Sequence, residues 1–268
     1  MRQVEIVKVD VSSKKSQKIT DYVAEEKPLH IFLNKTHYVT ILCSPSNLKE
    51  LTVGHLLSEG IVKSTEEIEE VNLKGDGTCS AKLKADVNLE KRLKLSKLHS
   101  RIIPSACGSP SPYQYSRKLS KVKSSLTVKA EVIFNCVNRL NVIAETFRKT
   151  GGVHAAAIYK SNGALVALAE DVGRHNAVDK VIGISALNKI SFSECFLALS
   201  GRLTGDIVFK AAKLGLPIVA SLAAATDSGI ALAKDANLTL VGFVRGNRMN
   251  LYTFPERINL NNQVHESR

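Results

Sequence analysis

The sequence predicts an α/β protein with a three-layer core, in which a mixed, largely parallel sheet has helices on both faces, plus a smaller N-terminal α+β domain. Two observations predict this fold class. Beyond residue 129, short apolar segments alternate with segments of helical periodicity, as in βα units. Several apolar segments contain almost no polar residues, as expected of strands covered on both faces. We therefore expect a small domain at 1–100, a cysteine-bearing loop at 101–128 and the core domain at 129–268.

The first 100 residues carry the patterns of short strands and helices. The alternation at 29–42 predicts a hairpin that turns near Asn34 and Lys35, and a second hairpin is expected around 75–77.

Two helices are also expected in this part. Asn47 and Glu50 have the spacing of a capping box at the start of a helix, and Gly60 is placed to end that helix. Residues 88–100 are basic with interspersed leucines, which favours a second helix.

The core domain shows a regular order of elements. A helix comes first and ends at Gly151 and Gly152, and a strand hairpin turns at 161–163. Helices and strands then alternate at residues 176–189, 196–201, 204–215, 217–225, 227–236 and 238–246.

Composition limits the classes of function. The longest apolar run, 218–225, has fewer than half the roughly 20 residues that a membrane span needs. Residues 1–15 alternate in polarity and lack the apolar block of a secretory signal. We therefore expect a cytoplasmic protein that does not bind a membrane.

The formal net charge of +12 requires an explanation. Nucleic acid is one candidate partner, but the chain has no Trp, 5% aromatic residues and no zinc-finger or helix-turn-helix pattern, so base recognition has little support. Part of the charge, around 84–97, fits a solvated helix face. An anionic ligand or an acidic protein partner is the remaining explanation.

The five cysteines differ in their surroundings. They form no CxxC pair, so neither a disulfide framework nor a zinc site is predicted. Cys136 and Cys195 lie in apolar segments typical of buried thiols. Cys107 lies in SACGSPSPYQ, within the long loop at 101–128, and long loops in compact domains usually carry function.

Polar residues cluster where the predicted strands end and helices begin. Ligands bind at such junctions because backbone N–H groups and helix dipoles converge there. Arg174 and His175 stand at a helix start, where positive charge requires a nearby anion or carboxylate. The candidate ligand residues at the junctions are Arg174, His175, Arg202, Asp227, Arg245 and Arg248.

This set predicts a pocket for a phosphate-bearing, nucleotide-like ligand. Neither a Walker A motif nor GxGxxG is present, so the standard nucleotide folds are not supported. Thr204, Thr226 and Asp227 fit equally well as plain N-caps.

His154 allows a test for zinc chemistry. Zinc deaminases carry H-x-E followed by P-C-x-x-C, whereas this chain has His154-Ala155-Ala156 and no cysteine pair downstream. We therefore expect no metal site, and His154 is either a ligand contact or a histidine of the core.

Taken in order, these motifs resemble the FdhD family of formate dehydrogenase accessory sulfurtransferases. The matching motifs are GHLLSEGIV at 54–62, ACG at 106–108, GGVHAAA at 151–157, EDVGRHNAVDKVIG at 170–183, SGRLTGDIVFKAAKLGLPIVAS at 200–221 and RGNRMNLYTFPERI at 245–258. The resemblance implies a cytidine-deaminase-like core that has lost its metal chemistry, and a homodimer.

The resemblance also implies an activity and its residues. The family takes persulfide sulfur from a cysteine desulfurase and delivers it to the bis-molybdopterin guanine dinucleotide cofactor of formate dehydrogenase, and a guanine nucleotide such as GDP is expected to mimic that cofactor. The persulfide cysteine falls on Cys107. The cofactor-binding segment falls on Phe243, Val244, Arg245, Gly246, Asn247 and Arg248.

The cysteine loop departs from the family pattern C-G-x-C-G. Here it reads Cys107-Gly108-Ser109-Pro110-Ser111, so the second thiol is replaced by Pro110. A one-cysteine carrier fits, because basic neighbours such as Arg117 and Lys118 favour a thiolate. A chaperone that binds the molybdenum cofactor without moving sulfur is the alternative, and a nucleic-acid-binding protein is a third.

Overall fold

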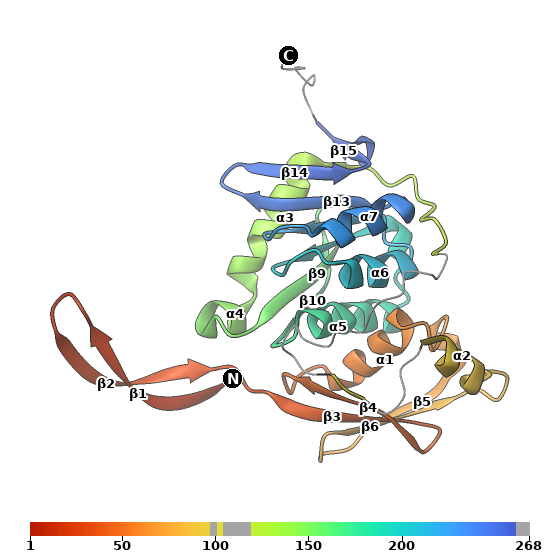
Figure 1. Ribbon diagram of the computed structural model, residues 1–268, viewed down its shortest axis with the longest axis horizontal. Helices are drawn as coiled ribbons and strands as arrows, with labels where there is room; N and C mark the ends of the chain where they lie inside the picture. Colours follow the sequence, from red (N-terminus) through yellow and green to blue (C-terminus); the bar gives the residue numbers. More distant parts are fainter. Residues whose placement is uncertain (97–100, 104–118, 261–268) are drawn as a thin grey trace.

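The computed structural model describes residues 1–96, 101–103 and 119–260. They form a mixed α/β structure with a two-stranded arm, a five-stranded sheet and a six-stranded sheet (Figure 1). Cys107, Arg117 and Lys118 lie outside the described residues.

The arm comes first in the chain. Strands β1 (Arg2–Asp10) and β2 (Lys15–Val23) pair in antiparallel register. Figure 1 shows this hairpin extending away from the rest of the molecule.

The five-stranded sheet confirms both predicted N-terminal hairpins. Its strand order is β5-β6-β3-β4-β7, and Asn34 and Lys35 turn between β3 and β4 with positive φ. The strands are β3 (Lys27–Leu33), β4 (Thr36–Cys43), β5 (Ile68–Leu73), β6 (Thr78–Leu83) and β7 (Arg101–Ile103). Strand β7 lies in the segment predicted as loop. It pairs in parallel with β4, and its two isoleucines suit a strand.

Helix α1 (Leu48–Ser58) forms where it was predicted, and Glu59 caps its end just before Gly60. The capping box is wrong: Asn47 has φ 50° and its side chain makes no cap hydrogen bond, because a left-handed residue directs its side chain away from the first-turn N–H groups. Helix α2 (Leu89–Ser96) confirms the basic helix, and a short 3-10 turn, η1, occupies Thr65–Glu67.

The six-stranded sheet has the order β10-β9-β11-β12-β13-β14. Only the pairings β11–β12 and β12–β13 are parallel, so the largely parallel sheet we predicted is wrong and the mixed sheet is right. Short hairpin turns force β9–β10 and β13–β14 to be antiparallel. The strands are β9 (His154–Lys160), β10 (Leu165–Asp171), β11 (Cys195–Leu199), β12 (Ile218–Ser221), β13 (Thr239–Arg245) and β14 (Arg248–Thr253).

Helices cover both faces of this sheet, as predicted. On one face, α3 packs Ile133 and Val137 against Phe196; on the other, Ile207 of α6 packs in a cluster with Leu197. The helix predicted to run up to Gly151 is broken at Ala144, whose ψ of 94° is not helical. The helices are α3 (Ala130–Ile143), α4 (Glu145–Thr150), α5 (Arg174–Leu187), α6 (Gly205–Lys213) and α7 (Asp227–Asp235). Smaller elements are β8 (Val128–Lys129), η2 (Phe192–Glu194), η3 (Pro255–Arg257) and β15 (Ile258–Asn259).

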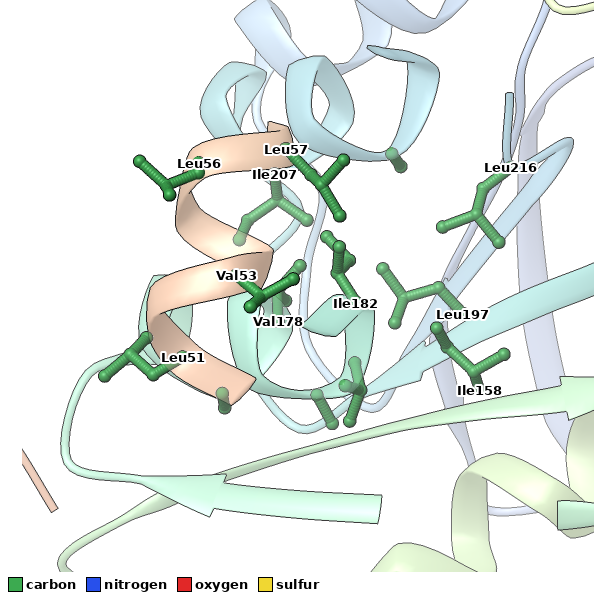
Figure 2. Close-up of a cluster of buried hydrophobic side chains, with 14 of the residues drawn as sticks. Leu51, Val53, Leu56, Leu57, Ile158, Val178, Ile182, Leu197, Ile207 and Leu216 are labelled. Carbon is green, nitrogen blue, oxygen red and sulfur yellow. The ribbon is translucent and has the colours of Figure 1, made fainter. Parts of the chain in front are cut away.

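Helices α1 and α5 join the two larger sheets. One hydrophobic cluster runs from Leu29 of β3 through these helices to Leu197 of β11; Figure 2 shows Val53 of α1 beside Val178 of α5. The two sheets thus share a core, and the division into domains at 1–100 and 129–268 stays a prediction.

Candidate functional site

The junctions predicted from the sequence gather at one edge of the six-stranded sheet. The parallel strands β11, β12 and β13 all end there, and their carboxyl ends form an edge where ligands commonly bind. His154, the first residue of β9, pairs with Asp171, the last residue of β10. The edge therefore brings His154 and the start of α5 beside the loops that follow the parallel strands.

Ser200 and Ser221 fix the first of these loops. The Ser200 hydroxyl accepts a hydrogen bond from the Ala155 N–H at 3.0 Å and lies 3.5 Å from Nδ1 of His154. The Ser221 hydroxyl, which is fully buried, donates to the Gly201 carbonyl at 2.6 Å. The loop after β11 is thus held against both β9 and β12.

The remaining loops are linked through their backbones. Leu203 N–H donates to the Ala224 carbonyl at 2.9 Å, and Phe243 N–H donates to the Ala223 carbonyl at 3.0 Å. The junctions after β11, β12 and β13 therefore form one hydrogen-bonded edge.

Arg174 is the buried cation of this edge. As the first residue of α5 it is 9% exposed, and its buried Nε finds no hydrogen-bond partner among the described residues. Burial, and next the charge of Arg202, lower the pKa of Arg174. Two guanidiniums that repel each other favour an anion between them.

Gly201 makes room for this arrangement. A Cβ at Gly201 would lie 3.2 Å from Cβ of Arg174 and 3.4 Å from Nδ1 of His154, so a larger residue would displace both side chains. Burial lowers the pKa of His154, the Asp171 carboxylate opposes that shift and Arg202 adds to it. The imidazole is therefore mostly neutral near pH 7, and a bound anion would favour its protonation.

Asp206 supplies the carboxylate that we expected near the start of α5. Its Oδ2 lies 3.7 Å from Nε2 of His175, and its charge also acts on Arg174. Burial raises the pKa of Asp206, with Lys210 and Arg174 opposing that shift. Burial, followed by the charges of Arg174 and Lys210, lowers the pKa of His175 to about 3. The structure places His175 beside Asp206, and a ligand contact by His175 stays a prediction.

The segment 243–248 contains the end of β13, the tight turn at Gly246 and Asn247, and the first residue of β14, and the turn lies where it was predicted. Gly246 and Asn247 both have positive φ, the requirement of a type I′ hairpin turn, and Arg245 pairs with Arg248 across it. The Arg245 guanidinium lies 5.2 Å from the centre of the Phe243 ring. Both arginines are exposed, whereas Val244 is buried.

A hollow of about 390 Å³ adjoins this turn. Its lining combines Asn247 and Arg248 with residues of α3, among them the aromatic Phe134 and the carboxylate of Glu131. The turn therefore presents charge and hydrogen-bonding groups beside a concave surface.

The start of α7 agrees with the N-cap alternative. Thr226 accepts from the Gly229 N–H through its hydroxyl at 3.2 Å, and Asp227 accepts from the Ser228 N–H at 2.7 Å. Thr204 occupies the cap position of α6 but makes no side-chain cap bond. A ligand contact by Asp227 stays a prediction.

The described thiols are enclosed. Cys43, Cys79, Cys136 and Cys195 are free and buried. Burial raises the pKa of Cys43 to about 12 and that of Cys136 to about 11, and it raises the pKa of the other two as well. These four thiols stay protonated near neutral pH.

The part of the chain that the structure describes has neither a membrane-spanning helix nor a cluster of metal ligands. None of its helices has the length and apolar character needed to cross a membrane. No three His, Cys, Asp or Glu side chains in it gather as metal ligands would.

Sequence reasoning missed the residues that hold the edge together. Ser200, Gly201 and Ser221 are small residues at strand ends, and of this stretch only the neighbouring Arg202 was predicted to contact a ligand. The junction position itself was the available signal, because hydroxyls there can link neighbouring loops.

Fold and site together define a mixed α/β protein in which Arg174, Arg202 and His154 gather at the carboxyl edge of the six-stranded sheet. The chain belongs to the FdhD/NarQ family, whose model matches residues 24–259.

Named relatives agree with this assignment. The chain is 39% identical over 262 residues to sulfur carrier protein FdhD of Sulfolobus acidocaldarius, with 97% of this chain and 99% of the relative covered. It is 35% identical over 243 residues to sulfur carrier protein FdhD of Staphylococcus aureus strain MRSA252, covering 89% and 90%.

A solved structure is similar over nearly the whole chain. It is a crystal structure reported as a formate dehydrogenase accessory protein from Desulfotalea psychrophila, and its sequence is 28% identical to this chain. The superposition has a TM-score of 0.74 and includes 96% of this chain and 99% of the solved chain.

Proposed function

We propose that this protein is a sulfur carrier: it accepts persulfide sulfur from a cysteine desulfurase on Cys107 and delivers that sulfur to the bis-molybdopterin guanine dinucleotide cofactor for formate dehydrogenase. The observation that carries the proposal is the contrast among the thiols. The four described cysteines are buried with raised pKa values, which leaves Cys107 as the candidate nucleophile. The sulfur-carrier names of the relatives support the same role.

The accepting step is a transfer between sulfurs. The Cys107 thiolate attacks the outer sulfur of the donor's persulfide, the S–S bond of the donor breaks, and the donor's thiolate leaves as a persulfide forms on Cys107. No net oxidation or reduction occurs, so this step requires only access and a thiolate.

The cationic edge is the proposed site for the phosphates of the cargo. Arg174 and Arg202 would bind them, His154 would donate a hydrogen bond, and the turn at 243–248 would hold the nucleotide end. The support is the buried Nε of Arg174, which has no hydrogen-bond partner within residues 1–96, 101–103 and 119–260, and the neighbouring charge of Arg202. A guanine nucleotide such as GDP should bind as a mimic.

Three further features belong to the same proposal. The core would be cytidine-deaminase-like with its metal chemistry lost, the chain would act in the cytoplasm as a homodimer, and the formate dehydrogenase apoenzyme would receive the loaded cofactor. Their support is the family membership.

The sulfur-transfer assay tests the proposal. Incubation with a cysteine desulfurase and cysteine should add the mass of one sulfur atom to the peptide that contains Cys107. Cys107→Ser should lose this adduct, whereas Cys136→Ser, which removes a buried thiol, should keep it. Wild-type protein that gains no sulfur on Cys107 while it binds GDP would favour the chaperone that Pro110 suggests.

Nucleotide affinity tests the edge. Arg174→Ala with Arg202→Ala should weaken GDP binding about a hundredfold or more, since each of the two lost charge-assisted bonds contributes about 1.5–3 kcal/mol. Arg245→Ala with Arg248→Ala should do the same, while Arg148→Ala, an exposed arginine of α4, should leave affinity unchanged. Tighter, steeply salt-dependent binding to generic duplex DNA would favour the nucleic-acid alternative.

A further inference from the structure

Asp206 is a half-buried carboxylate at the edge that carries Arg174. Its side chain is 27% exposed, and Nε2 of His175 lies 3.7 Å from its Oδ2, which is too long for a hydrogen bond. His175 is neutral near pH 7 because its pKa is lowered to about 3, so the two side chains form no ion pair. Burial raises the pKa of Asp206, and the charges of Lys210 and Arg174 oppose that rise, whereas no hydrogen bond does. Within the described residues, this carboxylate therefore accepts no hydrogen bond.

Two donors near Asp206 also have unused hydrogen-bonding capacity. The Nε of Arg174, a residue that is 9% exposed, and the Oγ1 of Thr204 are buried and have no partner among the described residues. The charge of Arg174 acts on Asp206, and Thr204 is the cap residue of the helix that carries Asp206. Because buried polar groups in native proteins are normally hydrogen-bonded, this set of two donors and one acceptor indicates a ligand that supplies the partners.

A phosphate group alone does not account for the carboxylate. Arg174 and Arg202 attract an anion, but the charge of Asp206 repels one. The helix dipole favours a negative charge in the first turn of α6, yet an exposed aspartate would gain the same interaction without the cost of burial. A carboxylate accepts hydrogen bonds and donates none, so its complement is a ligand group with N–H donors.

The proposed cargo contains two rings with such donors. Guanine and the pterin of molybdopterin share an aminopyrimidinone edge, in which an oxo group, a ring N–H and an exocyclic amino group stand side by side. A carboxylate can accept from the ring N–H and the amino group at once, and such bidentate, charge-assisted pairs are among the strong hydrogen bonds. The Thr204 hydroxyl and the Arg174 Nε–H are the available donors for the oxo group.

We propose that Asp206 recognises an aminopyrimidinone ring of the cargo by accepting hydrogen bonds from its ring N–H and its amino group. The inference rests on the proposed function, since the ring belongs to the cargo, and it names the residue that selects the ring. A ring without the amino group would leave part of a desolvated carboxylate unpaired, which is how a polar site rejects an analogue. Because the turn at 243–248 is the proposed site of the guanine end, the pterin is the ring expected at Asp206.

Ligand pairs that differ in the amino group test the recognition on the full-length wild-type protein. Titration calorimetry compares pterin with an oxopteridine that lacks the amino group, and GDP with inosine diphosphate. Pterin should bind about tenfold or more tightly than its analogue, because one charge-assisted hydrogen bond is lost. A preference within the GDP pair instead would assign the guanine ring to Asp206. Equal affinities within both pairs would overturn the proposal.

Asp206→Asn assigns the preference to this carboxylate. The amide has nearly the same shape but donates where the carboxylate accepts, so pterin should bind about tenfold more weakly and the preference for the amino group should vanish. Asp235→Asn changes an exposed carboxylate at the end of α7 and should keep both affinities. Thr204→Val removes the hydroxyl and should weaken both members of the pair equally, because both carry the oxo group.

The outcomes distinguish this inference from the proposed function. Binding of GDP together with an unchanged preference in Asp206→Asn would overturn recognition by Asp206 and leave the sulfur-carrier role intact. A Thr204→Val variant that loses the preference for the amino group would place the wrong end of the ring at Thr204 and contradict the arrangement. A wild-type protein that binds neither GDP nor pterin would contradict the cargo site itself, and the inference would fail with it.

Discussion

The Nζ of Lys180 lies 2.7 Å from Oδ2 of Asp171, and neither side chain is exposed to solvent. The same carboxylate accepts from the Ser44 N–H at 3.0 Å and, through Oδ1, from the Gly173 N–H at 2.8 Å. The pair therefore ties the chain after β4 to the junction between β10 and α5. It fixes the first turn of the helix that carries Arg174.

Breaking the Asp171–Lys180 ion pair should destabilise the folded protein. Asp171→Asn leaves the Lys180 charge buried without a counter-charge, which should lower the free energy of unfolding by about 3–5 kcal/mol. Urea denaturation measures the loss. The double variant Asp171→Asn with Lys180→Met should recover part of it because no uncompensated charge remains. If the free energy of unfolding of Asp171→Asn lies within about 1 kcal/mol of the wild-type value, the ion pair does not hold the junction.

Two glycines allow α1 and α5 to lie in close contact. A Cβ at Gly54 would overlap the Asp179 carbonyl, and one at Gly183 would overlap the Glu50 carbonyl. Gly→Ala in a helix normally stabilises by about 1 kcal/mol, but here the overlap with backbone reverses the sign. We expect Gly54→Ala and Gly183→Ala each to destabilise by about 3 kcal/mol or more.

Thermal unfolding checks the glycine contact. The matched control is Gly75→Ala, whose Cβ would meet nothing within 4 Å, and its melting temperature should stay near that of wild type. If Gly54→Ala has the same melting temperature as the Gly75→Ala control, α1 and α5 have room to separate, and the shared core is packed less tightly than the structure shows.

The sequence allowed the strand ends to be predicted, because turn residues and apolar runs are local signals. The hairpin at Asn34 and Lys35 and the turn at Gly246 and Asn247 follow from such signals, and both form. The largely parallel sheet failed for a non-local reason: direction depends on which strand each one joins, and β9 pairs antiparallel with β11 across the sheet.

The site was predictable in its charges and not in its contacts. Arg174 and Arg202 are 28 positions apart in the chain, and only the fold shows that their charges interact. The capping role of Asn47 failed because its backbone adopts a left-handed conformation.

Stability should fall as the pH falls below neutral, and His175 should cause part of the loss. Burial, then Arg174 and Lys210, lower the pKa of His175 from 6.5 to about 3. Between these two pH values His175 is protonated in the unfolded chain and neutral in the folded protein. The free energy of unfolding therefore rises with pH in this window. The contribution is fully present above pH 6.5 and is lost as the pH falls toward 3.

Comparison with His175→Gln isolates this effect. From pH 7 to pH 5 the wild-type free energy of unfolding should fall by about 2 kcal/mol more than that of the variant, at about 1.4 kcal/mol per pH unit per proton. Urea midpoints at several pH values give the slope. Parallel curves would mean that His175 titrates normally and that water reaches its ring.

Native-state thiol labelling should distinguish Cys107 from the other cysteines. Cys43 and Cys136 have pKa values raised to about 12 and about 11 by burial, and Cys79 and Cys195 are buried as well. Because the thiolate is the reactive form, iodoacetamide near pH 8 should add one label per chain. Intact mass counts the labels, and Cys107→Ser should take none until denaturant is added. More than one label on the native protein would show that a second thiol is accessible, and that cysteine would then have to be considered as the sulfur carrier.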